Sequence, residues 1–126
     1  MLYADCYETA LGMENGYITD DQITASSYYT PKIGCCYPYY ARLNHNTRWN
    51  ADHTQSNHWL KIDLRKNRTV TGLVTQGGNE WVTTINVKYE RPAGSEELHY
   101  VTDDDGVAKV NYNLVTELSV QYTFST

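Results

Sequence analysis

This chain of 126 residues is 40% hydrophobic and 20% charged, which excludes a disordered protein and indicates one folded domain covering residues 1–126. No apolar run is long enough to cross a bilayer. The first residues, MLYADC, have neither the basic start nor the apolar core of a signal peptide, so we interpret Met1 as preceding an excised mature domain.

The formal net charge of −5 is unevenly distributed along the chain. Residues 1–27 carry five acidic and no basic side chains, and residues 89–126 carry seven acidic and two basic ones. Residues 28–88 carry eight basic and three acidic side chains, so the middle of the chain should favour an anionic ligand. The alternative is that these Arg and Lys side chains only cover a solvated sheet face.

Alternation of apolar and polar residues predicts strands with one buried face, and helical periodicity is nearly absent. The alternating apolar positions are Leu60, Ile62, Leu64; Ile85, Val87, Tyr89; and Leu118, Val120, Tyr122, Phe124. The β-branched stretch Thr69–Thr75 predicts a more central strand. Turn signals separate these runs at Asn15-Gly16, Gly77-Gly78, Pro92–Ser95 and Asp103–Gly106. The pattern is typical of an all-β, antiparallel sandwich or barrel.

The segment from Tyr28 to Tyr40 is rich in tyrosine and has one charge, at Lys32. Its tyrosines are Tyr28, Tyr29, Tyr37, Tyr39 and Tyr40. An aromatic loop of this kind predicts a contact surface. Lys32 and Ile33 form a turn-like tip that suits a lipid surface, whereas the tyrosines suit a sugar or a protein. The alternatives are that Ile33 folds back onto the domain and that at least half of the tyrosines line the core.

Outside this loop, we expect Trp49, Trp59, Leu60, Ile62 and Leu64 to pack in the core. Arg42 should form an ion pair with Asp63 or Asp21 rather than bind a ligand. Asn44, His45, Asn46 and Arg48 are candidates for polar ligand contacts.

The sequence contains three cysteines, Cys6, Cys35 and Cys36. All three are disulfide candidates, with Cys6 pairing with one of the other two in an oxidising compartment. A bridge between the neighbours Cys35 and Cys36 needs strained geometry, so we do not expect it.

No nucleophile–base signature, phosphate-binding glycine loop or metal-ligand spacing occurs, so we expect no enzyme, no metal and no cofactor. Nor do we expect a nucleic-acid partner. The run Asp103–Asp105 is interpreted as a solvated turn rather than a calcium site. Asn67-Arg68-Thr69 is a glycosylation sequon, which makes Asn67 a candidate acceptor in a secreted protein.

Several blocks of the sequence resemble the discoidin domain, also called the coagulation factor V/VIII type C domain. They are LGMENG from Leu11, DQITASS from Asp21, ARLN from Ala41, Trp49, WLKIDL from Trp59, VTG from Val70, TQG from Thr75 and WVT from Trp81. They occur in the family's order and spacing over roughly residues 6–90.

The resemblance implies a jelly-roll β-sandwich whose loops at one end bind ligand, and an extracellular, non-enzymatic adhesion or recognition module. The two loops that carry binding in the family correspond here to Tyr28–Tyr40 and Gln76–Trp81. Lipid-binding members insert apolar loop tips into membranes, lectin-like members hold sugars, and other members bind collagen or growth factors. Cys6 matches the family's first cysteine, but the closing segment with its partner cysteine is missing, so the domain is shorter than the pattern at its C-terminal part.

Three hypotheses follow for the ligand. The first is an anionic phospholipid membrane at the cell surface, contacted by Ile33 and Trp81. The second is a carbohydrate bound by the loop tyrosines and Arg48. The third is an extracellular matrix protein, with a free cysteine linking chains. The candidate binding residues are Tyr28, Tyr29, Lys32, Ile33, Tyr37, Tyr39, Arg48, Asn79 and Trp81.

Overall fold

The computed structural model describes residues 2–4, 9–30, 35–77, 82–91, 96–101 and 107–124. Its strands are β1 (Leu2–Ala4), β2 (Thr9–Ala10), β3 (Ile23–Ala25), β4 (His58–Val74), β5 (Val82–Glu90), β6 (Glu96–Val101) and β7 (Val107–Phe124). Two short 3₁₀ helices, η1 (Asp20–Gln22) and η2 (Pro38–Tyr40), are the helical elements of this part of the chain. None of the described helices is long and apolar enough to span a membrane.

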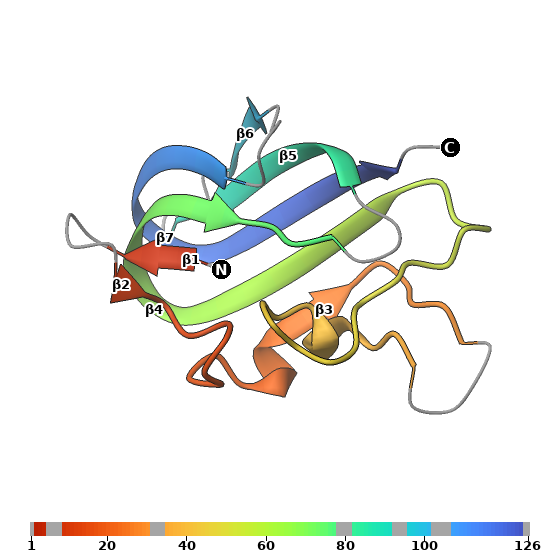
Figure 1. Cartoon of the computed structure of the whole chain (residues 1–126). Coiled ribbons are helices and arrows are strands. Elements are labelled where there is room, and N and C mark those ends of the chain that lie inside the picture. Colours follow the sequence, from red (N-terminus) through yellow and green to blue (C-terminus); the bar gives the residue numbers. More distant parts are fainter. Residues whose placement is uncertain are drawn as a thin grey trace.

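All strands belong to one antiparallel sheet with the order β2-β1-β4-β7-β5-β6, and β3 pairs with β4 beside this path (Figure 1). The two longest strands, β4 and β7, lie next to each other in its centre. Both bend back strongly in Figure 1, so the sheet wraps around its own core. This arrangement confirms the predicted all-β, antiparallel sandwich.

The bend in β4 lies at the polar sequence Arg65–Arg68. Asp63 pairs with Glu117 and Arg68 with Val115, so the residues between them on β4 outnumber those on β7, as in a large bulge. Arg65 has a φ of 62°, in the left-handed region that sharpens such a bend. We predicted two separate strands here, Leu60–Leu64 and Thr69–Thr75, whereas the structure joins them in one bent strand.

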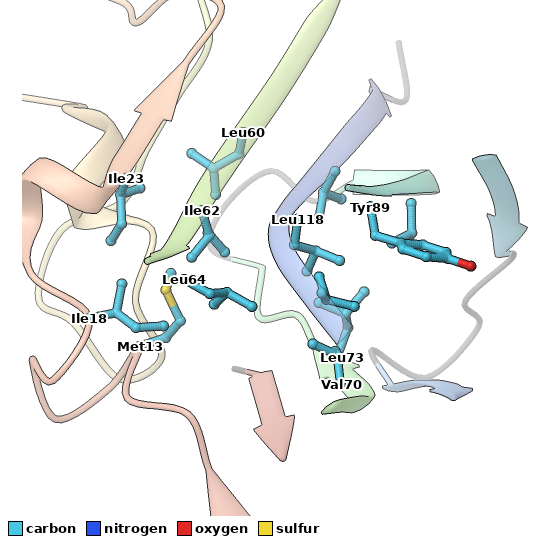
Figure 2. Packing of buried hydrophobic residues seen from close by; sticks show 13 residues of the cluster. Met13, Ile18, Ile23, Leu60, Ile62, Leu64, Val70, Leu73, Tyr89 and Leu118 are labelled. Atoms are coloured by element: carbon cyan, nitrogen blue, oxygen red, sulfur yellow. The ribbon is translucent and has the colours of Figure 1, made fainter. Parts of the chain in front are cut away.

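The core is formed by buried aliphatic side chains from β4, β5 and β7, together with Met13, Ile18 and Ile23 (Figure 2). Of the predicted inward positions of three strands, the buried ones are Leu60, Ile62, Leu64, Val87, Tyr89, Leu118 and Val120. The side chains of Ile85, Tyr122 and Phe124 lie outside the part of the chain whose burial the structure describes. Burying a side chain of this size contributes about 1.5–3 kcal/mol, so this cluster is the main source of stability.

The assignment of Trp59 to the core is wrong. Trp59 is half-buried, and the ammonium of Lys61 lies 5.4 Å from the centroid of its ring. Successive side chains of a strand point to opposite faces, so Trp59 shares a face with Lys61 while Leu60 and Ile62 enter the core. Trp49 does pack against the core, as predicted.

Candidate ligand-binding loops

Both loops predicted to bind ligand are attached to the ends of β4 that lie far from its bend. The long segment from Ser26 to Asn57 precedes His58, and the segment that starts at Thr75 follows Val74. Since the bend lies midway along β4, the two segments leave the sandwich at the same end. The topology therefore brings together the described ends of the two loops that the resemblance pointed to.

Four tyrosines of the first loop form one ring cluster, which we call the tyrosine cluster: Tyr28, Tyr37, Tyr39 and Tyr40. Tyr37 is its centre, with ring centroids 5.1 Å from Tyr28, 5.3 Å from Tyr39 and 5.6 Å from Tyr40. The ring of Tyr39 stacks on Tyr37 and meets Tyr40 edge-on at 4.9 Å. Aromatic pairs in such geometries contribute about 0.5–1.5 kcal/mol each beyond their buried area.

The tyrosines of the first loop fall into a half-buried group and an exposed group. Tyr39 packs against the hydrophobic core, and Tyr37 and Tyr40 are half-buried. Tyr28 and Tyr29 keep 40% and 44% of their surface exposed. The interpretation that at least half of these tyrosines line the core is therefore wrong, since one of the five packs against it.

Two histidines extend the aromatic surface. The ring of His45 stacks on Tyr40 at 5.0 Å, and the ring of His53 meets Tyr29 edge-on at 6.4 Å. Both histidines are exposed. Their contacts with the tyrosines were missed in the sequence, because His53 lies far along the chain from Tyr29 and has no motif of its own.

Hydrogen bonds to residues 49–52 fix the backbone at the start of the first loop. The indole Nε1 of Trp49 donates to the carbonyl oxygen of Ser27 at 2.9 Å. The backbone N–H of Tyr29 donates to the carbonyl of Asn50 at 2.8 Å, and that of Asp52 to the Ser27 hydroxyl at 3.0 Å. The backbone beside the exposed tyrosines is thus fixed by a second segment of chain, which reduces the entropy lost when a ligand binds.

Asp52 supports this second segment through a local turn. Its carboxylate accepts hydrogen bonds from the backbone N–H of Thr54 at 3.0 Å and from the Thr54 hydroxyl at 2.9 Å. These two bonds lower the pKa of Asp52 below its ordinary value, because they favour the charged form.

Cys35 and Cys36 are joined by a disulfide, so the expectation that neighbouring cysteines do not pair is wrong for this structure. Cys36 adopts a φ of 71°, is buried, and forms an isolated parallel bridge with Trp49. The unusual backbone of Cys36 gives the chain a sharp turn immediately before Tyr37. Cys6 lies outside the described residues, but its expected pairing with Cys35 or Cys36 is contradicted, because those two cysteines are bonded to each other.

Arg42 links the end of the first loop to the segment that contains Met13 and Ile18. Its guanidinium donates to the carbonyl oxygens of Met13 at 2.7 Å, Ile18 at 2.9 Å and Tyr39 at 3.0 Å. It also forms an ion pair with Asp20 at 2.7 Å, whereas we expected Asp63 or Asp21. Asp21 pairs with Arg65 instead, since η1 points its two carboxylates to different partners. The structural role predicted for Arg42 is confirmed.

A small polar network connects the start of the second loop to the segment that follows the first loop. The backbone N–H of Asn44 donates to Oε1 of Gln76 at 2.7 Å, and Nδ2 of Asn44 donates to Oε1 of Glu14 at 2.8 Å. Gln76 begins the second loop, and Glu14 belongs to the turn that Gly16, with a φ of +83°, makes as predicted. The network was not foreseen, because its members come from three distant parts of the sequence.

Arg48 supplies an exposed positive charge in this region. Arg48 is exposed and has no ion pair within the described part of the chain, while Arg42 is neutralised by Asp20. Of the other predicted contact residues, Lys32, Ile33, Asn79 and Trp81 lie outside the described residues. Asn67 is exposed at the bend of β4, at a distance from both loops.

The model of the F5/8 type C domain family matches residues 22–124 of the chain. Coagulation factor VIII of Mus musculus is 42% identical over 95 residues, which cover 73% of this chain and 4% of factor VIII. Lactadherin of Sus scrofa is 38% identical over 108 residues, which cover 81% of this chain and 24% of lactadherin. The chain thus spans a small part of these relatives.

Solved structures with low sequence identity share the fold. A carbohydrate-binding module produced by Clostridium perfringens has a TM-score of 0.63 at 15% identity, covering 90% of this chain and 83% of the other. The family 32 carbohydrate-binding module of C. perfringens NanJ, solved with galactose, has a TM-score of 0.58 at 20% identity, covering 82% and 84%. These likenesses agree with the jelly-roll sandwich. The family model and the sequence matches show that this chain belongs to the F5/8 type C, or discoidin, domain family.

Proposed function

We propose that this chain is an extracellular, non-enzymatic recognition module that binds anionic phospholipid surfaces through the loops at one end of its sandwich. The observation that carries the proposal is the exposure of Tyr28 and Tyr29 on a backbone held by Trp49 and Asn50. Exposed rings on a rigid frame mark a surface prepared for a partner.

The chemistry of this surface suits a membrane interface. Tyrosine has an apolar ring and a polar hydroxyl, and it is enriched where hydrocarbon meets lipid headgroups. Arg48 adds a cation without an ion pair among the described residues, and residues 28–88 as a whole carry the positive excess. A basic residue near an anionic membrane contributes about 1 kcal/mol of attraction.

The family supports the same choice. In the lipid-binding members, apolar residues at the tips of these two loops enter the membrane. The corresponding residues here are Ile33 in the first loop and Trp81 in the second. The sequence matches to factor VIII and lactadherin cover 73% and 81% of this chain but 4% and 24% of those proteins, so the likeness is to a domain-sized part of each.

Co-sedimentation with vesicles containing phosphatidylserine tests the proposal, with phosphatidylcholine vesicles as the control. We expect Tyr28→Ala/Tyr29→Ala to weaken binding roughly tenfold, equivalent to about 1.4 kcal/mol. Ile33→Ala should weaken binding in the same direction. Tyr17→Ala is the matched control, because Tyr17 is 83% exposed but lies on the framework turn. Equal sedimentation of wild type and the double variant would overturn the membrane proposal.

A carbohydrate ligand is the second candidate. The tyrosine cluster offers ring faces for stacking, and His45, Asn46 and Arg48 offer polar groups in the same loop region. Among proteins of this fold, one is a chitosan-binding module from a Paenibacillus chitosanase and another was solved with galactose. A glycan array distinguishes the two functions: specific glycan binding that Tyr28→Ala abolishes, without vesicle binding, would favour the lectin.

A further inference from the structure

We propose that Asn67 carries an N-linked glycan, placed at the end of the sandwich opposite to the binding loops. The inference depends on the extracellular part of the proposed function, because glycan transfer requires passage through the secretory pathway. Asn67-Arg68-Thr69 is the single Asn-x-Ser/Thr sequence in the chain, so a glycan would have one acceptor.

The folded structure can accept a large group at this position. The side chain of Asn67 is exposed, and so are its neighbours Lys66 and Arg68. Because the register shifts between Asp63 and Arg68, the residues of the bend do not pair regularly with β7. A glycan here would replace neither a core contact nor a described side-chain hydrogen bond of Asn67.

The position also keeps the glycan away from the ligand. From the bend, β4 runs back to His58, where the first loop ends, and forward to Val74, where the second loop starts. Each half contains about seven residues, which span roughly 20 Å at the usual rise of a strand. In Figure 1 the bend of β4 and the yellow loop segment lie on opposite sides of the molecule.

The glycan is transferred to Asn67 by substitution at the anomeric carbon of its donor. Nδ2 of Asn67 forms a bond to the anomeric carbon of an oligosaccharide carried on a lipid pyrophosphate. The bond from that carbon to the phosphate oxygen breaks, the lipid pyrophosphate leaves with the electron pair, and the amide nitrogen loses one proton. The hydroxyl of Thr69 is the group that the transferase recognises in the sequon.

Secretion of the chain from mammalian cells, followed by digestion with a peptide N-glycosidase, tests the inference. We expect the mass of the wild type to fall by one glycan on digestion. Asn67→Gln and Thr69→Ala should lack this change, whereas Thr69→Ser should keep it. Asn57→Gln is the matched control, because Asn57 is also exposed but lies outside a sequon. Secreted wild type without a glycan, or a change in mass that persists in Asn67→Gln, would overturn the site.

Vesicle binding by the digested and undigested protein tests the placement. Equal binding of both forms is expected, because the glycan lies away from the loops. If only the digested form bound vesicles, the glycan would lie near the loops and the placement would be wrong. If neither form bound while the glycan was present, the membrane proposal would fail and the glycosylation site would stand.

Discussion

Asn44, in the segment that follows the first candidate binding loop, is hydrogen-bonded to Gln76 at the start of the second loop. The N–H of Asn44 donates to Oε1 of Gln76 at 2.7 Å, and Nε2 of Gln76 returns a longer bond of 3.4 Å to Oδ1 of Asn44. Asn44 has a φ of 56°, a left-handed backbone conformation that asparagine tolerates better than most residues. The position of the start of the second loop therefore depends on the backbone conformation of Asn44, shortly after the first loop.

Substitutions of Asn44 should separate the backbone effect from the side-chain effect. Asn44→Ala loses the bond to Glu14 and places an unsuitable residue at positive φ, so we expect a loss of about 1–2 kcal/mol in the free energy of unfolding. Asn44→Gly loses the same side chain but accepts the conformation, so its loss should be smaller. Urea unfolding measures both. Equal losses in the two variants would show that the conformation carries no cost.

Arg42 should be the polar side chain of the loop region to which stability is most sensitive. Its side chain is 9% exposed, and its removal leaves the carbonyls of Met13, Ile18 and Tyr39 without this donor. We expect Arg42→Ala to cost about 3 kcal/mol or more, and Arg42→Lys to recover only part of it, because an ammonium cannot reproduce the planar fork.

Asp20→Asn provides the control for Arg42. The side chain of Asp20 is 65% exposed, so its ion pair with Arg42 is well solvated on one side and should contribute less than about 1 kcal/mol. Thermal or urea unfolding measures the difference between the two substitutions. A loss in Asp20→Asn as large as that in Arg42→Ala would show that the charge, not the three carbonyl contacts, stabilises the loop.

Tyr39 should titrate later than an ordinary tyrosine. Burial against the core raises the pKa of Tyr39, and the neighbouring hydroxyls of Tyr40 and Tyr37 act in the same direction. The neutral form is favoured in the folded state, so this contribution to stability is complete below the ordinary pKa of about 10 and is lost as the pH rises through the folded pKa. Absorbance titration of tyrosinate should show a late component that disappears in Tyr39→Phe. A titration curve unchanged by that substitution would contradict the shift.

The sequence predicted those parts of the fold in which a strand has one buried face. Val87 and Tyr89 in β5, and Leu118 and Val120 in β7, alternate because the sheet covers a core on one side. The short strands β1, β2 and β3 are too brief to show such a period, and β6 begins with two glutamates. Long-range pairing, rather than local pattern, makes these segments strands.

The site was predicted less completely than the fold. Composition alone indicated a loop surface at Tyr28–Tyr40, because so many rings are unusual in an unburied segment. The contacts of His53 with Tyr29 and of Asn44 with Gln76 depend on how the chain folds back, which no local spacing records. For Trp59 the local pattern was sufficient but was not used. Its size suggested burial in the core, although alternation with Leu60 already placed it on the other face of the strand.

The bond between Cys35 and Cys36 gives a direct chemical prediction. In the native protein, alkylation without prior reduction should leave both residues unlabelled, and mass spectrometry should place the bridge within one peptide. After reduction, the same peptide should take up two alkyl groups. Cys36 forms an isolated β-bridge with Trp49 and directly precedes Tyr37 in the chain. Reduction should therefore also change the near-ultraviolet circular dichroism of the tyrosine cluster. A disulfide-linked peptide joining Cys6 to either residue would contradict this pairing and restore the one expected for Cys6 from the sequence.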